Sequence, residues 1–155
     1  MTVYFSFGSN KGERQSNIQK ALEGLENALG APPKAVSEII ETKSWGFDGP
    51  DFLNCAASFK TDYSPEKILS VCKEIERSLG RTDSPEYTPD GRRIYHSRTI
   101  DIDILFYGTQ RVKTKDLTIP HPLIKERDFV KIPLSQIVGQ DIRDAFPEIF
   151  INLQD

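Results

Sequence analysis

The order of strand-like and helix-like segments constrains the fold of this chain more than any other feature of its sequence. In chain order the segments are a strand at 3–7, a helix from about 16 to 29, strands at 36–42 and 52–60, a helix at 65–79 and a strand at 99–107. This is the order of the split βαβ, or ferredoxin-like, arrangement, in which an antiparallel sheet carries two helices on one face. We therefore expect an α+β fold built on a ferredoxin-like βαββαβ core.

The two helices have the clearest local signals. Apolar residues recur at helical spacing in both, and Gly30 and Gly80 end them. Ser64 and Pro65 supply a cap and a first-turn proline for the second helix. Beyond residue 113 the pattern predicts only a short apolar segment at 129–132 and a loosely packed tail. We expect this C-terminal extension to cover the other face of the sheet, giving a three-layer α-β-α sandwich.

Composition indicates one ordinary globular domain over residues 1–155, with 28% charged and 37% hydrophobic residues. The net charge of −3 gives no general attraction to nucleic acid or membranes, so any phosphate ligand must be held by local cations. Cys55 and Cys72 lack a metal-type spacing and are predicted to be buried thiols of a reducing compartment. No run approaches the roughly 18 apolar residues of a membrane span. We expect a cytoplasmic monomer without nucleic-acid or membrane partners.

Two aspartates stand in the segment with the strongest strand pattern, Arg98-Thr-Ile-Asp101-Ile-Asp103-Ile-Leu-Phe-Tyr107. Side chains alternate along a strand, so Asp101 and Asp103 share one face while the isoleucines share the other. Like charges about 6.5 Å apart repel by roughly 2.5 kcal/mol at an effective dielectric near 20. A bound cation would offset that repulsion, and a few oxygen ligands favour Mg²⁺ that also takes waters and phosphate oxygens. The pair therefore predicts a magnesium-dependent enzyme that works on nucleotide phosphates.

Two other interpretations of the aspartate pair stay open. The carboxylates could be exposed solubility residues, although Leu105 continues the same face. They could also pair with Arg98 alone. However, Arg98 lies an odd number of residues from both, so a regular strand turns its side chain to the opposite face.

The 17 residues from Arg81 to Ser97 show no periodicity and read as one long loop. Loops of this length are uncommon in compact domains and often close over ligands. Arginine binds phosphate oxygens bidentately, which favours a lid over a polyphosphate. The arginines concerned are Arg81, Arg92 and Arg93, followed directly by Arg98. The alternative is a solvated loop, because Asp83, Glu86 and Asp90 nearly balance their charge.

Three weaker features accompany the pair. Thr118-Ile-Pro-His121-Pro122 predicts a rigid turn that presents His121, and Arg127 adds a phosphate-type donor. The segment 7–12 is glycine-rich but has neither the Walker nor the dinucleotide spacing, so it predicts only a tight turn near a ligand. Phe52-Leu-Asn54 could offer an aromatic face and an amide to a flat heterocycle, or simply be a core phenylalanine beside a strand-edge asparagine.

Taken together, these segments resemble the 6-hydroxymethyl-7,8-dihydropterin pyrophosphokinase family of folate synthesis. The resemblance runs almost end to end and rests on motifs in a fixed order: Phe7-Gly-Ser-Asn10 with Gly12, Arg14 and Asn17; Phe52-Leu-Asn54; Glu76 with Gly80-Arg81; Arg98-Thr-Ile-Asp-Ile-Asp103; and Leu117-Thr-Ile-Pro-His-Pro122 with Arg127 and Phe129. It implies transfer of a diphosphate group from ATP to the hydroxymethyl oxygen of the pterin, with release of AMP.

The resemblance also implies roles for individual residues. Asp101 and Asp103 would hold Mg²⁺, as two ions, and Arg81 and Arg98 would act with them on the phosphates. The pterin contacts implied are Thr42, Trp45, Phe52, Asn54 and Phe129. The nucleotide contacts implied are Glu76, Arg98, Ile104, Thr118, His121 and Arg127. The chain departs from the common family pattern at Trp45, Lys73, Tyr95 and Asp116.

Two functions of other classes fit the same topology. A non-catalytic small-molecule sensor domain would not need two aspartates on one strand face. An RNA-binding domain would need exposed aromatic residues on the central strands and a basic sheet face, and the sequence predicts neither.

Overall fold

The main sheet has five antiparallel strands. The computed structural model describes residues 1–43, 51–80, 86–94 and 99–150. Strand β1 (Thr2–Ser9) lies between β4 (Phe52–Lys60) and β7 (Asp101–Tyr107). The outer edge of β4 pairs with two short strands, β2 (Ala35–Val36) and β3 (Ile40–Thr42), while β7 forms the other edge. The predicted ferredoxin-like core is therefore confirmed.

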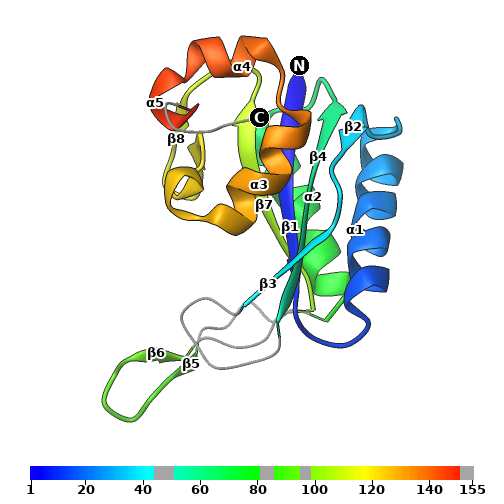
Figure 1. The fold of residues 1–155 in the computed structure, drawn as a ribbon. Coiled ribbons are helices and arrows are strands. Elements are labelled where there is room, and N and C mark those ends of the chain that lie inside the picture. The colour runs from blue at the N-terminus through cyan, green and yellow to red at the C-terminus, as the bar shows by residue number, and fades with distance from the viewer. Residues whose placement is uncertain (44–50, 81–85, 95–98, 151–155) are drawn as a thin grey trace.

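One face of the sheet is covered by the two long helices, α1 (Arg14–Leu29) and α2 (Pro65–Ser78), as Figure 1 shows. Gly30 ends α1 in the left-handed conformation at φ 76°, and the Ser64 side chain accepts from the Lys67 amide to cap α2. Alternate residues of the three long strands meet the apolar faces of these helices in a first core. Its largest fully buried members include Phe5, Phe7, Phe59, Ile18, Leu25 and Ile68.

The C-terminal extension covers the opposite face (Figure 1). It consists of a 3-10 turn, η1 (Ile124–Glu126), and three helices, α3 (Asp128–Ile137), α4 (Gln140–Ala145) and α5 (Pro147–Phe150). These elements form a second core with Tyr4, Leu105 and Phe106 of the sheet. The three-layer sandwich is confirmed, but the prediction of a loosely packed tail is wrong. Pro133 interrupts the pattern of α3, and the other two helices are too short to show a helical period.

A register shift in the β1–β7 pairing lets one strand serve both cores. Tyr4 pairs with Phe106 but Phe5 pairs with Ile104, so Leu105 is an extra residue in β7. Leu105 and Phe106 consequently both pack in the second core, while Ile104 and Tyr107 belong to the first. Leu105 does continue the face of the aspartates, as the alternation predicted.

Three predicted boundaries need correction. The strand predicted at 36–42 is two short strands, because the Ser37 hydroxyl accepts from the Ala56 amide at 2.8 Å and interrupts the pairing. The strand predicted from residue 99 begins at Asp101. The loop predicted at 81–97 contains a hairpin of β5 (Glu86–Tyr87) and β6 (Arg93–Ile94), which projects beyond the main sheet in Figure 1. Two-residue strands are too short to alternate visibly in a sequence.

The last two strands, β8 (Val112–Lys113) and β9 (Thr118–Ile119), form a separate small antiparallel pair after β7. The Ile119–Pro120 peptide bond is cis. The His121 amide then donates to the Leu105 carbonyl at 3.1 Å, which holds the following turn against β7. In the described residues, no helix is both long and apolar enough to cross a membrane.

Candidate active site

A row of register partners crosses the sheet on the face of the C-terminal extension. Asn54 of β4 lies opposite Gly8 of β1, and Gly8 lies opposite Asp101 of β7. One step along the strands, Ser6 pairs with both Ala56 and Asp103. Neighbouring strands are about 4.8 Å apart, so roughly 10 Å separates the backbone at Asn54 from that at Asp101. The sheet therefore presents an amide and a carboxylate about the width of a small heterocycle apart.

Gly8 leaves the middle of this row without a side chain. A Cβ atom at this position would lie 3.3 Å from Asn54 Oδ1 and 3.5 Å from Phe52 Cδ1. The first of these separations is tighter than ordinary packing. Glycine thus lets the side chains of Phe52 and Asn54 lie close to β1, beside the aspartates.

Asn54 and Thr42 form a polar pair at one end of the row. The Asn54 side chain is 2% exposed, and its Nδ2 donates to Thr42 Oγ1 at 2.7 Å. That bond fixes the amide, with Oδ1 toward Gly8. Because the Thr42 oxygen accepts, its own hydrogen can be donated elsewhere. The pair can therefore offer both an acceptor and a donor to the edge of a ring.

The two aspartates form the other end of the row and are both partly exposed. Two basic side chains face the Asp103 carboxylate. Arg127 Nη1 lies 3.8 Å from one of its oxygens, and His121 Nε2 lies 3.8 Å from the other. Arg127 precedes α3, and His121 follows β9. Two basic side chains from the segment after β9 thus meet β7 where the strand pattern predicted the metal ligands.

The hydrogen bonding of His121 defines which nitrogen carries its proton. Nδ1 accepts from the Leu123 amide at 3.1 Å. Burial lowers the pKa of His121 and the charge of Arg127 lowers it further, while Asp101 opposes them. The neutral ring must then carry its proton on Nε2, which faces Asp103. In this tautomer, the Nε2–H of His121 can donate a hydrogen bond at this site.

Glu76 holds the strand between the two aspartates. It lies on α2, is 5% exposed, and accepts from the Ile102 amide through Oε2 at 2.7 Å. Ile102 separates Asp101 from Asp103 on an edge strand, where one row of amides faces away from the neighbouring strand. The resemblance implies a nucleotide contact at Glu76; in the structure its carboxylate supports the backbone between the aspartates.

Phe129 lies in the first turn of α3, which packs against β3 and β4. Its ring is partly buried at the edge of the second core, and the Arg127 guanidinium carbon lies 5.6 Å from the ring centroid. Phe52 on β4 is also partly exposed. The two phenylalanines thus come from elements that lie side by side.

The oxygen donors at this site suit magnesium. Across residues 1–43, 51–80, 86–94 and 99–150, no group of three or more His, Cys, Asp or Glu side chains is arranged to hold a metal. Two carboxylates without nitrogen or sulfur ligands match an ion that completes its shell with water and substrate phosphate. The donor set therefore fits Mg²⁺ bound together with a polyphosphate.

The family model for 7,8-dihydro-6-hydroxymethylpterin-pyrophosphokinase (HPPK) matches residues 4–139, which include every residue of the site above. The chain belongs to this family. It is 40% identical over 137 residues to the 2-amino-4-hydroxy-6-hydroxymethyldihydropteridine pyrophosphokinase of Porphyromonas gingivalis, covering 87% of this chain and 89% of the relative. It is 39% identical to the enzyme of the same name from Aquifex aeolicus, covering 88% and 79%.

The fold is also that of a solved structure described as HPPK-DHPS in complex with substrates. The TM-score is 0.64 at 15% sequence identity, and the match covers 95% of this chain. This chain spans 43% of that longer chain. The likeness supports the ferredoxin-like assignment.

The structure describes only some of the other residues that the HPPK resemblance implied. Arg81, Arg98 and Trp45 lie outside the described residues, as does part of the predicted lid. Arg92 is described and pairs with Asp90 at 2.9 Å in the turn of the β5–β6 hairpin. Thr118 is exposed on β9.

Ile104 is 4% exposed and packs in the first core, on the opposite face from the aspartates. This position can therefore offer a nucleotide its backbone but little side-chain surface.

Cys55 and Cys72 are confirmed as buried thiols. Burial raises the pKa of both, and for Cys72 the nearby carboxylates of Glu76 and Asp103 add to the effect.

Two motif residues, Asn17 and Arg14, make structural contacts that the sequence did not predict. Asn17 is buried and its Nδ2 donates to the Lys11 carbonyl at 2.9 Å, which braces the turn after β1. Arg14 joins α1 to β3 and to the residue before β4. Both appear in the family motif, but nothing in the local pattern shows which distant groups they contact.

Proposed function

We propose that this chain transfers diphosphate from ATP to 6-hydroxymethyl-7,8-dihydropterin on the row of residues from Thr42 to Asp103. Membership of the HPPK family makes the chain an ATP-dependent diphosphotransferase of folate biosynthesis. The observation that carries the residue assignment is the row itself. The Asn54 amide and the two carboxylates lie on one face of the sheet, about two strand spacings apart, and the Thr42 hydroxyl bonds that amide. This arrangement supports a ring site at one end of the row and a phosphate site at the other.

The Asn54 end of the row is the proposed pterin site. Asn54 and Thr42 hydrogen-bond the polar edge of the ring, while Phe52 and Phe129 stack on its faces. A flat heterocycle with donors and acceptors on one edge needs both kinds of contact. The hydroxymethyl arm then extends along the row toward the aspartates.

The Asp103 end of the row is the proposed phosphate site. Asp101 and Asp103 hold Mg²⁺, as two ions, which when bound neutralises phosphate charge and aligns the attacking and leaving oxygens. Arg127 donates to phosphate oxygens as a permanent cation, and His121 donates through Nε2 as a neutral group. Positioning and charge stabilisation of this kind account for most catalysis of phosphoryl transfer.

The remaining nucleotide contacts that the resemblance implies are Thr118, Ile104 and Glu76. Thr118 is exposed on β9, and Ile104 contributes its backbone. Glu76 supports the strand between the aspartates. Arg81, Arg98 and Trp45 are proposed from the resemblance alone. We also propose that residues 1–155 work as one catalytic domain, as a monomer in the cytoplasm.

Replacing Phe129 with alanine should weaken pterin binding about tenfold and leave ATP binding nearly unchanged. Stacking of a heterocycle on an aromatic side chain contributes about 1–3 kcal/mol, and here only the pterin ring stacks on Phe129. Calorimetry with each ligand, using an unreactive ATP analogue for the ternary complex, measures the two affinities. Val130→Ala is the control, since Val130 is 3% exposed in the second core. Equal losses for both ligands in Phe129→Ala would make Phe129 a core residue.

The two amide replacements of His121 should differ. Glutamine can place an N–H near the position of Nε2, whereas asparagine can place one only near Nδ1. We therefore expect His121→Gln to keep the KM for ATP within about threefold of wild type. His121→Asn should raise it about tenfold or more, because one hydrogen bond to a charged group contributes about 1.5–3 kcal/mol. Steady-state kinetics at saturating pterin measure both. The reverse order would contradict the assigned tautomer.

The reaction itself is tested by omitting one component at a time. AMP and the pterin diphosphate should form in equal amounts only when ATP, Mg²⁺ and the pterin are all present. Formation of ADP in place of AMP would mean transfer of a single phosphoryl group. Pterin binding without any turnover of ATP would favour the sensor domain.

A further inference from the structure

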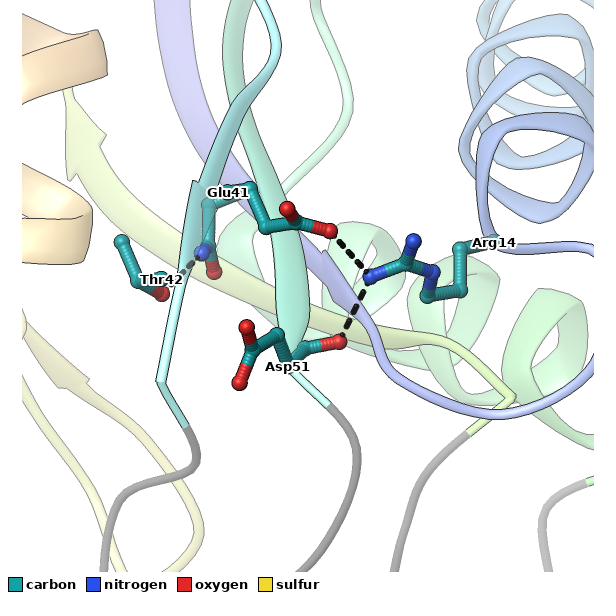
Figure 2. A network of polar contacts seen from close by, with 5 residues as sticks. Arg14, Glu41, Thr42 and Asp51 are labelled. Atoms are coloured by element: carbon teal, nitrogen blue, oxygen red, sulfur yellow. Dashed lines mark hydrogen bonds and ion pairs between the residues drawn. The ribbon is translucent and has the colours of Figure 1, made fainter.

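Arg14 joins helix α1 to the two strands that carry the pterin residues, as Figure 2 shows. Its Nη1 donates to Glu41 Oε2 at 2.7 Å and to the main-chain oxygen of Asp51 at 2.9 Å. Glu41 lies in β3, and Asp51 directly precedes β4. One nitrogen therefore ties the end of one strand to the start of the next.

The groups that Arg14 holds are the immediate neighbours of Thr42 and Phe52, which pair in register with each other. Side chains alternate along β3, so Glu41 and Thr42 point to opposite faces. The register partner of Glu41 is Leu53, which packs against the first core on the α1 side. Arg14 thus acts from the face of the sheet opposite the pterin site.

The position of Arg14 does not favour the helix that contains it. It is the first residue of α1, where the helix dipole disfavours a cation. The first turn contains no acidic residue, and Glu13 makes no capping hydrogen bond with its side chain. A residue that opposes local helix stability points to a use elsewhere in the molecule.

We infer that Arg14 is a positioning residue that fixes Thr42 and Phe52 for the pterin without touching it. This role rests on the proposed function of the Asn54 end of the row. The bond to the Asp51 oxygen sets where β4 begins, and the bond to Glu41 sets where β3 ends. Together they determine the spacing between the threonine hydroxyl and the phenylalanine ring.

The variant Arg14→Ala tests this role. Its affinity for the pterin, measured by calorimetry with Mg²⁺ and an unreactive ATP analogue present, should fall about tenfold, because loosening a preorganised site costs binding free energy. Its affinity for the ATP analogue alone should stay within about twofold of wild type, since the phosphate end lies on β7 and on the segment between β9 and α3. The matched control is Arg111→Ala, which removes a 2.6 Å ion pair with Glu148 far along the chain.

Variants of Glu41 test the mechanism. Glu41→Gln keeps an oxygen acceptor and should retain most of the pterin affinity, whereas Glu41→Ala should lose part of it. The double variant Arg14→Ala with Glu41→Ala should bind the pterin no more weakly than Arg14→Ala alone, because both changes break one link. An ordinary surface ion pair would change none of these affinities.

Two results would overturn the role of Arg14. The first is that Arg14→Ala binds the pterin as tightly as Arg111→Ala does. The second is that Arg14→Ala loses pterin binding and nucleotide binding equally. A wild-type chain that binds no pterin would instead overturn the proposed function, and the role of Arg14 with it.

Discussion

Replacing Asp101 or Asp103 with asparagine should lower turnover by roughly a thousandfold, which is the upper range for loss of one electrostatic contact to a transition state. Each change keeps the shape of the side chain but removes a charge that the proposed Mg²⁺ requires. The control is Asp144→Asn, an aspartate of α4 that accepts from Gln140. Turnover is measured as AMP formation at saturating ATP, pterin and Mg²⁺.

The two variants should differ in stability. Asp101→Asn relieves repulsion within the pair and should leave the melting temperature unchanged or slightly raised. Asp103→Asn also removes the attraction to Arg127 at 3.8 Å, so its gain should be smaller. Turnover like that of wild type in either variant would contradict the assignment of both carboxylates as metal ligands.

The second large effect is expected at Glu76. Glu76→Ala leaves the Ile102 amide without its 2.7 Å acceptor in a buried setting, which costs about 1.5–3 kcal/mol of unfolding free energy. The same change frees the backbone between the aspartates, so kcat should fall about tenfold or more while the KM for ATP changes little. Urea denaturation and steady-state kinetics measure the two effects.

Two further variants distinguish the two possible roles of Glu76, which are support of the strand and contact with the nucleotide. Glu76→Gln retains an oxygen that can accept from Ile102 and should recover most of both losses. Glu74→Ala changes an exposed glutamate on the same helix and should alter neither quantity. A rise in the KM for ATP with unchanged stability would instead restore the nucleotide contact that the resemblance implied.

The elements with strong local patterns were predictable from the sequence. The strand 52–60 was predicted with the bounds it has, and Ser64 and Gly30 marked helix ends because capping chemistry is local. The aspartate pair was predictable for the same reason, since strand alternation alone puts Asp101 and Asp103 on one face. Phe106 shows the limit, because a one-residue bulge turned it into the second core.

The features of the site that could not be predicted from the sequence depend on contacts between distant segments. Glu76 meets Ile102 across 26 residues and Arg14 meets Asp51 across 37, and neither pair leaves a periodic signal. The tautomer of His121 likewise depends on a bond to Leu123 that only the folded turn creates. Helix α3 was missed because Pro133 conceals it, although tertiary packing on β4 stabilises it.

The claim that Asp101 and Asp103 hold the ions is tested most directly by counting bound metal. Mn²⁺ can replace Mg²⁺ at oxygen sites and can be quantified by electron paramagnetic resonance with an unreactive ATP analogue and the pterin present. We expect two bound Mn²⁺ ions per wild-type chain. The double variant Asp101→Asn with Asp103→Asn should bind at most one ion, the one that the nucleotide carries. Two tightly bound ions in that double variant would contradict the assignment.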